Sequence, residues 1–543
     1  MSRTPLFSVI QRSFRLARHA VRTGQPVDEV VERARAAGPG LSRRQFLGGT
    51  AAAAGLVLAG VRPFAARAQT APGREVVIVG AGIAGLTAGY RLHQAGVPVR
   101  ILEAQERTGG RMWSLRDDRI FPGQVAELGG ELIDTNHVNI RNLAAELEIP
   151  LDDFAFDGWD LHRDLWFFDG RRITEKELVE AFVPVSQRLI EDLSSLEGDW
   201  VTYREPNGGG RLDRMTIAQW LETSGAAPWL KKLLDVAYVT EVGLETDRQS
   251  ALNFLLLIDP NPLPFRIYGG SDERFHVRGG NDLIPGRLAE ILGDRIERGV
   301  RLEALRKTAD GALVASVRKG ETSREITAEH MVIAIPFTLL REVRLDDSLG
   351  LPLAKREAIA KLGYGTNSKL MVGFSDRIWR KKYKSNGSTL TDLGYQVSWE
   401  TSRLQPGKAG ILTNFTGGRH GAKMGEGTPE ERAKEFLGQF DRIFPGAAQA
   451  ASGKAVRFVW PDFAWTRGSY TCYQPGQWTD FGGVEGEPVG NLHFAGEHCS
   501  AEAQGFMEGG CETGEKVAQE ILCEMGVELR EVAAVPRRLR LAS

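Results

Sequence analysis

The chain has 543 residues, and its 68 Lys and Arg nearly balance its 70 Asp and Glu, so the net charge is only -2 and nucleic acid is not expected as a partner. The length allows two large domains with ample apolar cores. The four cysteines, which lie between Cys472 and Cys523, lack the Cys-x-x-Cys spacing of zinc and redox motifs, so the sequence predicts no metal site and requires no disulfide.

Two adjacent arginines begin a signal-like pattern near the N-terminus. The run SRRQFL at 42–47 precedes a mildly apolar, Ala- and Gly-rich stretch at 48–61 and a small-x-small pattern that ends at Ala68. This order resembles a twin-arginine signal peptide, which implies the twin-arginine translocation machinery as a partner and a periplasmic or secreted location. The apolar stretch is shorter than the about 20 residues of a membrane span, and a retained anchor is the alternative. Residues 1–68 are therefore assigned to an N-terminal extension and signal.

An apolar strand pattern at 75–79 leads into the glycine turn GAGIAG at 80–85 and then into a helix. Glycines at the first two positions let the backbone approach a pyrophosphate at the helix N-terminus, and the third lets helix and strand pack closely. A second strand at 99–102 ends at Glu103, which is placed to accept a hydrogen bond from an adenosine ribose. The predicted nucleotide contacts of this unit are Gly80, Gly82, Ile83, Ala84, Gly85, Glu103 and Ala104.

The segments that follow distinguish FAD from NAD. RTGGR at 107–111 and ELGG at 127–130 resemble the flavin amine oxidase superfamily. The resemblance implies that Arg111 binds the FAD diphosphate and that the backbone at Gly129 and Gly130 lies along the isoalloxazine ring. The family often has an arginine two residues after the ribose-binding acid, and Gln105 stands there in this chain, so one phosphate contact is expected to be weaker.

Two central segments extend the resemblance. HVRGGND at 276–282 precedes a helix and a strand at 296–302, where Val300 holds the position whose backbone contacts adenine in the family. The apolar segment at 331–340 is expected to return a strand to the sheet.

Near the C-terminus, LHFAGE at 492–497 and GFMEGG at 505–510 resemble the closing FAD segment of the family. A helix that begins at about Met507 would direct its N-terminal amides at the flavin. The resemblance implies four more cofactor contacts: Gly496, Glu497, Gly505 and Met507.

The resemblance also assigns the residues of the reaction. Lys369 interrupts an apolar strand pattern at 367–374, and the lysine of this family strand holds a water against flavin N5 and assists the reaction with O2. A lysine on an edge strand that reaches solvent is the alternative. Ser469 stands where monoamine oxidases have the cysteine bound to the flavin, so the FAD is expected to be noncovalent. Tyr470 and Phe506 stand where the family places the two aromatic side chains that flank the substrate amine.

The class of substrate depends on a few residues. Leu132 stands where snake-venom-type L-amino acid oxidases carry a carboxylate-binding arginine, which favours an amine over an amino acid. Glu131 and Asp134 are either solvated loop carboxylates or a site for a second cationic group. The segment at 259–274 is rich in Pro and Gly and is expected to line the access to the site. Two of its arginines keep the amino acid alternative open: Arg266 and Arg274.

Together these features predict an α/β fold with a discontinuous, Rossmann-like FAD-binding domain, built around a parallel sheet with helices on its faces, and a mixed α+β substrate-binding domain. Apolar periodicity predicts two helices of the substrate-binding domain, at 174–196 and 226–238. The FAD-binding domain is assigned to 71–147, 273–343 and 460–530, the substrate-binding domain to 148–272 and 344–459, and a tail to 531–543. The predicted reaction oxidises a primary or secondary amine to an imine and reduces O2 to H2O2. The alternatives are an L-amino acid oxidase, a desaturase or porphyrinogen oxidase on the same scaffold, and an exported nonenzymatic flavoprotein. Assembly as a homodimer is left open.

Overall fold

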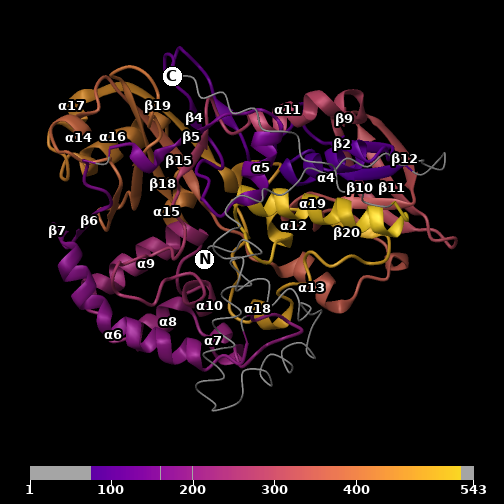
Figure 1. Ribbon diagram of the computed structural model, residues 1–543, viewed down its shortest axis with the longest axis horizontal. Helices are drawn as coiled ribbons and strands as arrows, with labels where there is room; N and C mark the ends of the chain where they lie inside the picture. The colour runs from indigo at the N-terminus through magenta and orange to yellow at the C-terminus, as the bar shows by residue number, and fades with distance from the viewer. Residues whose placement is uncertain (1–74, 159, 199, 528–543) are drawn as a thin grey trace, which may run out of the picture.

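The computed structural model describes residues 75–158, 160–198 and 200–527, so the predicted signal at 1–68 and the tail at 531–543 lie outside the described residues. One half of the molecule is built around a five-stranded parallel sheet and the other around a seven-stranded mixed sheet (Figure 1). This is the predicted pairing of a Rossmann-like unit with a mixed α+β unit. No helix within the described ranges is long and apolar enough to cross a membrane.

The parallel sheet has the strand order β20-β13-β1-β2-β9. Its strands are β1 (Val76–Val79), β2 (Val99–Glu103), β9 (Ile296–Arg298), β13 (His330–Ile333) and β20 (Leu492–Phe494). Every residue of β1 is buried, as expected for a central parallel strand that is covered on both faces. All five strands come from the three segments assigned to the FAD-binding domain.

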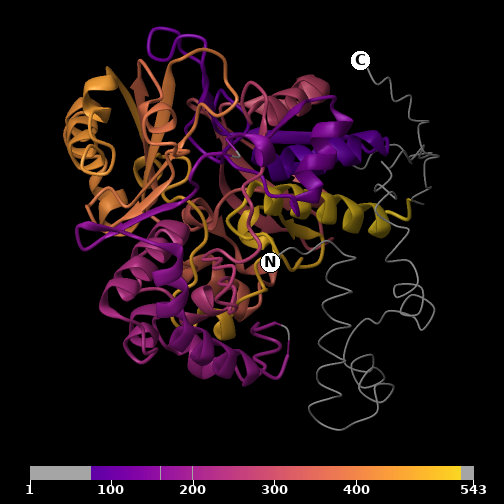
Figure 2. The ribbon, with the colours of Figure 1, turned by 60° about the vertical axis from the view of Figure 1, so that its left-hand side comes forward.

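Helices cover one face of this sheet. They are α4 (Ile83–Gln94), α11 (Leu283–Leu292) and α19 (Met507–Glu524), and Val76 and Ile78 pack against them. In Figure 2, α19 (yellow) runs beside α4 (indigo). The two helices approach closely because Gly514 has no side chain, and a Cβ there would stand 2.5 Å from the backbone oxygen of Ala84.

The other face carries a second sheet, which corrects the expectation of helices on both faces. Val77 and Val79 point to that side and pack against the sheet β12-β11-β10-β14. Its strands are β10 (Val300–Lys307), β11 (Leu313–Lys319), β12 (Thr322–Ala328) and β14 (Arg344–Leu345). The strand expected at 331–340 ends at Ile333, because Pro336 leads into the short helix α12 (Phe337–Leu340).

The mixed sheet has the order β19-β15-β18-β17-β16-β6-β7. Its strands are β6 (Leu165–Phe168), β7 (Arg171–Ile173), β15 (Ser368–Phe374), β16 (Thr389–Thr391), β17 (Val397–Glu400), β18 (Gly410–Thr416) and β19 (Ala451–Val459). On β15, Leu370 and Val372 pack against α16 (Pro429–Phe440), so Lys369 and Met371 face the opposite side. Because β15 lies between two other strands, the edge-strand interpretation of Lys369 is wrong.

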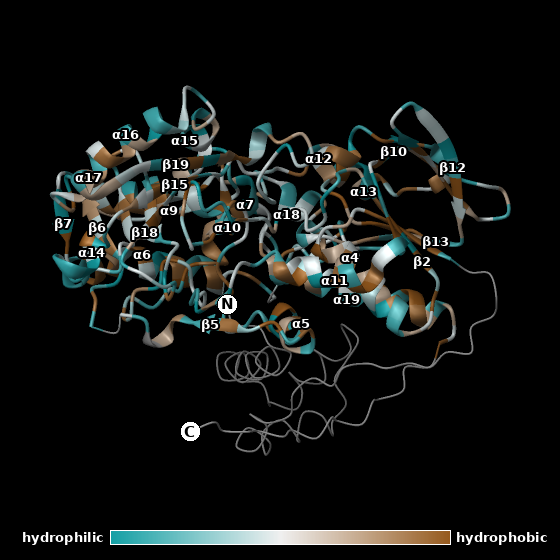
Figure 3. Cartoon of the chain, turned by 90° about the horizontal axis from the view of Figure 1, so that it is seen from above, coloured by the Kyte–Doolittle hydropathy of each residue, from teal (hydrophilic) through white to brown (hydrophobic). Residues whose placement is uncertain are grey.

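Two long helices pack together below this sheet. The helix α6 (Glu175–Ser194) begins with a capping box between Thr174 and Glu177, and α9 (Pro228–Val242) ends at Gly243, whose φ is 84°. Both were predicted from their apolar periodicity, and Figure 3 shows the apolar residues gathered along interior elements such as β2 and β13.

The remaining elements are short, apart from two helices of nine residues each. They are α5 (Val138–Glu146), α7 (Gly210–Arg214), α8 (Ile217–Glu222), α10 (Ala251–Leu255), α13 (Leu353–Lys361), α14 (Ile378–Lys381), α15 (Gly418–Lys423), α17 (Ala447–Ala450), α18 (Gln477–Asp480), β3 (Ser114–Leu115), β4 (Ala126–Glu127), β5 (Leu151–Asp153) and β8 (Phe275–Val277). Cys472, Cys499, Cys511 and Cys523 are all free thiols.

Candidate functional site

A cavity of about 1070 Å³ opens at the carboxyl ends of the parallel strands and extends to the mixed sheet. Ligands of open α/β sheets bind at this edge, and the volume exceeds that of most small-ligand pockets, which hold roughly 300–1,000 Å³. The predicted site residues that line it are Gly80, Gly82, Ile83, Ala84, Glu103, Ala104, Arg111, Gly129, Gly130, Val300, Lys369, Tyr470, Gly496, Glu497, Gly505, Phe506 and Met507. Segments from Gly80 to Met507 therefore meet around one space.

The glycine turn after β1 has the geometry of a phosphate-binding turn. Gly80 has a φ of +107°. A Cβ there would stand 2.6 Å from the backbone oxygen of Ala334, which directly follows the neighbouring strand β13. A Cβ at Gly82 would meet nothing within 4 Å, so the backbone is open to the cavity there. Gly85 was also counted among the nucleotide contacts but does not line the cavity. A Cβ there would stand 2.0 Å from Gly80 O, in agreement with its predicted role in packing the helix against the strand.

Glu103 closes the same turn from the end of β2. One carboxylate oxygen accepts a hydrogen bond from Ala81 N at 2.8 Å, and the other accepts one from Gln105 N at 2.9 Å. Burial raises the pKa of Glu103 above its ordinary value, although these backbone donors oppose the shift. The ribose contact itself stays a prediction.

Arg111, from the segment 107–111, contacts the C-terminal cofactor segment that contains Glu497. Its Nη1 donates to Glu497 Oε1 at 2.7 Å and to the backbone oxygen of Ser469 at 2.9 Å. Burial alone would raise the pKa of Glu497, but the charge and hydrogen bond of Arg111 hold it below the ordinary value. The other oxygen of Glu497 accepts from Gly505 N at 2.8 Å, which fixes the loop before α19. The open glycine turn, the helix N-termini and the cavity volume fit an FAD at these residues.

Lys369 points into the cavity beside the segment 127–131. Its Nζ donates to Gly129 O at 2.7 Å, to Glu127 O at 3.2 Å and to Glu131 Oε2 at 2.7 Å. Glu131 also accepts from Trp399 Nε1 at 2.9 Å and Thr401 Oγ1 at 2.8 Å. Burial opposes its ionisation, but the Lys369 charge and these donors hold the pKa of Glu131 below its ordinary value.

The two loop acids are therefore neither solvated nor free to bind a substrate, which corrects both interpretations of them. Glu131 and Asp134 are 7% and 4% exposed. One Asp134 oxygen accepts from Ser271 Oγ at 3.0 Å, Asp272 N at 3.2 Å and Glu273 N at 2.7 Å, so Asp134 holds the 271–273 loop in place.

The aromatic residues predicted to flank the substrate lie close to each other. A Cβ at Gly505, which precedes Phe506, would stand 3.4 Å from the ring of Tyr470. The Tyr470 hydroxyl donates to the backbone oxygen of Glu241 at 2.6 Å, and the Phe506 ring lies 5.0 Å from that of His137. Ser469 is buried and donates to Asn367 Oδ1 at 2.7 Å. The structure thus brings these residues together, while their roles stay predictions.

Two cavity carboxylates were missed by the sequence reasoning. Glu241 is the second-last residue of α9, and Glu273 lies two residues before β8. Among the described residues, neither side chain has an ion pair or a hydrogen bond. Burial, together with the nearby Asp134, raises the pKa of Glu241 to about 7 and that of Glu273 to about 8; Glu241 adds to the second shift. The Glu273 side chain is exposed to solvent only through the cavity, and protein surrounds the side chain on its other sides. A lone acid at the end of the apolar run of α9 was the available signal for Glu241.

The arginines proposed for a substrate carboxylate do not serve that role. Arg274 donates to Asp153 at 2.9 and 2.7 Å, and neither Arg274 nor Arg266 lines the cavity. Leu132 does line it, at the position that favoured an amine.

Comparison with known proteins identifies the family. Residues 83–522 match the model of the flavin containing amine oxidoreductases. The chain belongs to this family. It is 26% identical over 465 residues to amine oxidase [flavin-containing] B of Homo sapiens, covering 83% of this chain and 86% of the relative. The flavin-containing amine oxidase of Danio rerio is 24% identical over 471 residues, covering 84% of this chain and 87% of the relative.

Solved structures show the same fold. Cyclohexylamine oxidase from Brevibacterium oxydans superposes with a TM-score of 0.73 at 25% identity, covering 84% of this chain and all (100%) of that one. Putrescine oxidase bound to putrescine superposes with a TM-score of 0.69 at 21% identity, covering 83% and 99%. The chain is thus a flavin-containing oxidase that acts on CH–NH2 groups, and the family implies FAD as its cofactor.

Proposed function

We propose that the protein oxidises amines that carry a second positive charge, such as diamines, rather than L-amino acids. The supporting observation is the pair Glu241 and Glu273, which line the cavity and form no ion pair with a Lys, Arg or His among the described residues. Glu241 is half-buried, Glu273 is open to the cavity, and the two carboxylates are close enough to raise each other's energy when both are charged. A bound ammonium would supply the counter-charge that such a pair attracts. An L-amino acid would need a cation to bind its carboxylate. Leu132 is apolar, and Arg274 is paired with Asp153 outside the cavity, so neither position provides that cation.

The chemistry is a two-electron oxidation. FAD held at the glycine turn, Arg111 and the loop before α19 would supply this oxidation. The amine would lose a hydride equivalent and a proton to give an imine, water would hydrolyse the imine, and O2 would be reduced to H2O2. Tyr470 and Phe506 would provide apolar walls that favour the neutral form of the reacting amine. Glu241 and Glu273 would hold the second, charged nitrogen, and Lys369 would remain at the flavin side, held by Glu131.

The proposal is tested by anaerobic mixing of the purified flavoprotein with a panel of diamines, monoamines and L-amino acids. We expect diamines to bleach the flavin absorbance at the lowest concentrations, and aerobic assays to give one H2O2 per amine oxidised. Faster reduction by L-amino acids would contradict the proposal, and reduction by none of the three classes would favour the desaturase-like or nonenzymatic alternatives.

We also propose that the FAD is noncovalent. Ser469 replaces the cysteine of the covalent family members, and its hydroxyl is engaged with Asn367. Acid precipitation is expected to release essentially all flavin absorbance into the supernatant. Flavin that stays with the precipitated protein, and a peptide mass raised by one FAD, would show a covalent link instead.

Export is proposed from the sequence alone. The twin-arginine pair and the small-x-small pattern support translocation of the folded protein and cleavage after Ala68. Intact mass of the protein recovered outside the cytoplasm is expected to begin at Gln69. A full-length product that stays with the membrane would identify a retained anchor.

A further inference from the structure

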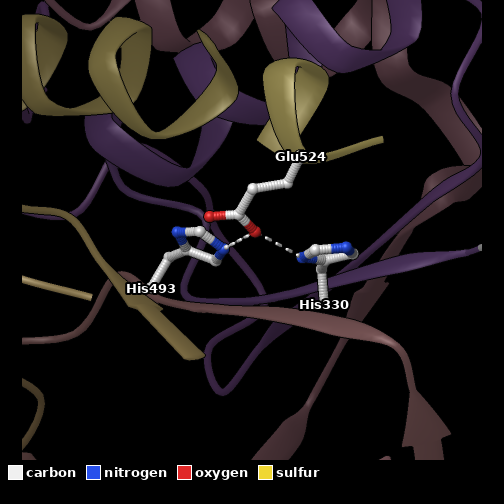
Figure 4. Close-up of side chains that lie close together, drawn as sticks. All are labelled: His330, His493 and Glu524. Atoms are coloured by element: carbon white, nitrogen blue, oxygen red, sulfur yellow. Dashed lines mark ion pairs between the residues drawn. The ribbon is translucent and has the colours of Figure 1, made fainter. Parts of the chain in front are cut away.

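Two histidines and a glutamate converge at the edge of the parallel sheet that lies opposite the cavity (Figure 4). His330 begins β13, His493 lies on the neighbouring strand β20, and Glu524 ends α19. Glu524 Oε2 stands 3.4 Å from His330 Nδ1 and 3.5 Å from His493 Nε2. One ligand atom from each of the three side chains lies within 4.8 Å of the other two.

These separations fit a shared ion better than direct hydrogen bonds, for which 2.7–3.2 Å is typical. In a tetrahedral zinc site with metal–ligand distances of about 2.0–2.1 Å, the ligand atoms lie roughly 3.3–3.4 Å apart. The two nitrogen–oxygen distances of 3.4 and 3.5 Å in the structure are close to that value. Two imidazoles and one carboxylate are also a donor set that zinc accepts.

His493 provides an independent observation. It is 0% exposed, and neither of its ring nitrogens has a hydrogen bond in the part of the chain that the structure describes. Its second nitrogen, Nδ1, faces Glu520 Oε2 at 3.5 Å, one helical turn before Glu524. Metal-bound histidines commonly donate their other N–H to a carboxylate, which orients the ring. Glu520 occupies that place.

We propose that His330, His493 and Glu524 bind one Zn²⁺ ion, with water at the remaining position and Glu520 orienting His493. Glu524 has a side chain that is 42% exposed, so the ion reaches the site from solvent. The C-terminus of α19 also favours a cation. The ion would join the end of α19 to β13 and β20, and α19 begins at the cavity with Met507, so its role is to hold that helix in place.

The test uses FAD-loaded protein freed of metal with EDTA and titrated with ZnCl2 by calorimetry. We expect one equivalent to bind with a Kd below about 1 μM, and saturation to raise the Tm by several degrees because only the folded chain presents the site. Glu524→Gln is expected to weaken zinc binding about 100-fold or more. The Tm of the zinc-free variant should stay near that of the wild type, because Glu524 is partly exposed and makes no short hydrogen bond.

Two controls make the outcome decisive. Glu430→Gln changes an exposed carboxylate on α16 and should bind zinc as the wild type does. Cys523→Ser removes the neighbouring exposed thiol and should also bind normally. The proposal is overturned if the wild type binds no stoichiometric zinc. It is also overturned if Glu524→Gln binds as tightly as the wild type, or if Cys523→Ser abolishes binding.

Discussion

Lys369→Met is expected to slow the reoxidation of reduced flavin by O2 about 10²-fold, the usual cost of removing one preorganised charge or donor from a site. The ammonium lies within the cavity, where it donates to Gly129 O and Glu131. Methionine keeps the unbranched shape of the side chain and is only one atom shorter, so FAD should stay bound and reduction by amine should change little. Stopped-flow mixing of the amine-reduced enzyme with O2 measures the effect.

A second variant separates this role from simple loss of stability. Lys369→Met leaves Glu131 buried without its counter-charge, which typically costs about 3–5 kcal/mol. The double variant Lys369→Met/Glu131→Gln removes both charges and should recover the Tm but not the rate with O2. Lys454→Met, on an exposed part of β19, is the matched control and should behave as the wild type. Normal reoxidation in the double variant would exclude Lys369 from the oxidative step.

The sequence predicted the parts of the fold that depend on local pattern. The strand at Val76–Val79, the turn with its positive φ at Gly80 and the helix α4 follow one another within a few residues, so their apolar pattern and glycines specify them. The second sheet on the far face of β1 was not predicted, since a fully buried strand looks the same whether helices or strands cover it.

The charged contacts of the site could not be read from the sequence. Glu131 and Lys369 are 238 residues apart, and only the approach of the 127–131 segment to β15 makes them a pair. Similarly, Asp134 looked like a loop carboxylate until the fold brought the 271–273 backbone to it. The raised pKa of Glu273 depends on burial and on Asp134 and Glu241, all of them consequences of tertiary structure.

Replacing Glu241 and Glu273 by Gln is expected to raise the KM for 1,5-diaminopentane about 10- to 100-fold while changing that for pentylamine little. The factor corresponds to a hydrogen bond to a charged group, worth about 1.5–3 kcal/mol. Each single variant should show part of the loss. Glu222→Gln, which alters a surface acid paired with Lys231, is the matched control. Equal KM changes for both amines would mean that the two acids do not select a second charge.

The pH dependence gives a sharper form of the same test. With pKa values of about 7 and about 8, Glu241 and Glu273 ionise as the pH rises from 6 to 8.5, so diamine binding should strengthen over that range. The ratio of kcat/KM for diaminopentane to that for pentylamine cancels the titration of the reacting nitrogen, and it should rise with pH in the wild type but stay flat in the double variant.

The same two acids should also make the stability of the fold depend on pH. Because both pKa values are raised from 4.5, the folded chain binds more protons than the unfolded chain between pH 4.5 and 8, and stability falls as the pH rises. The Gln variants lack these ionising groups and should not lose stability in this way, so their Tm at pH 8 should equal or exceed that of the wild type. A lower Tm in the variants would show that the two carboxylates stabilise the fold and do not serve substrate binding.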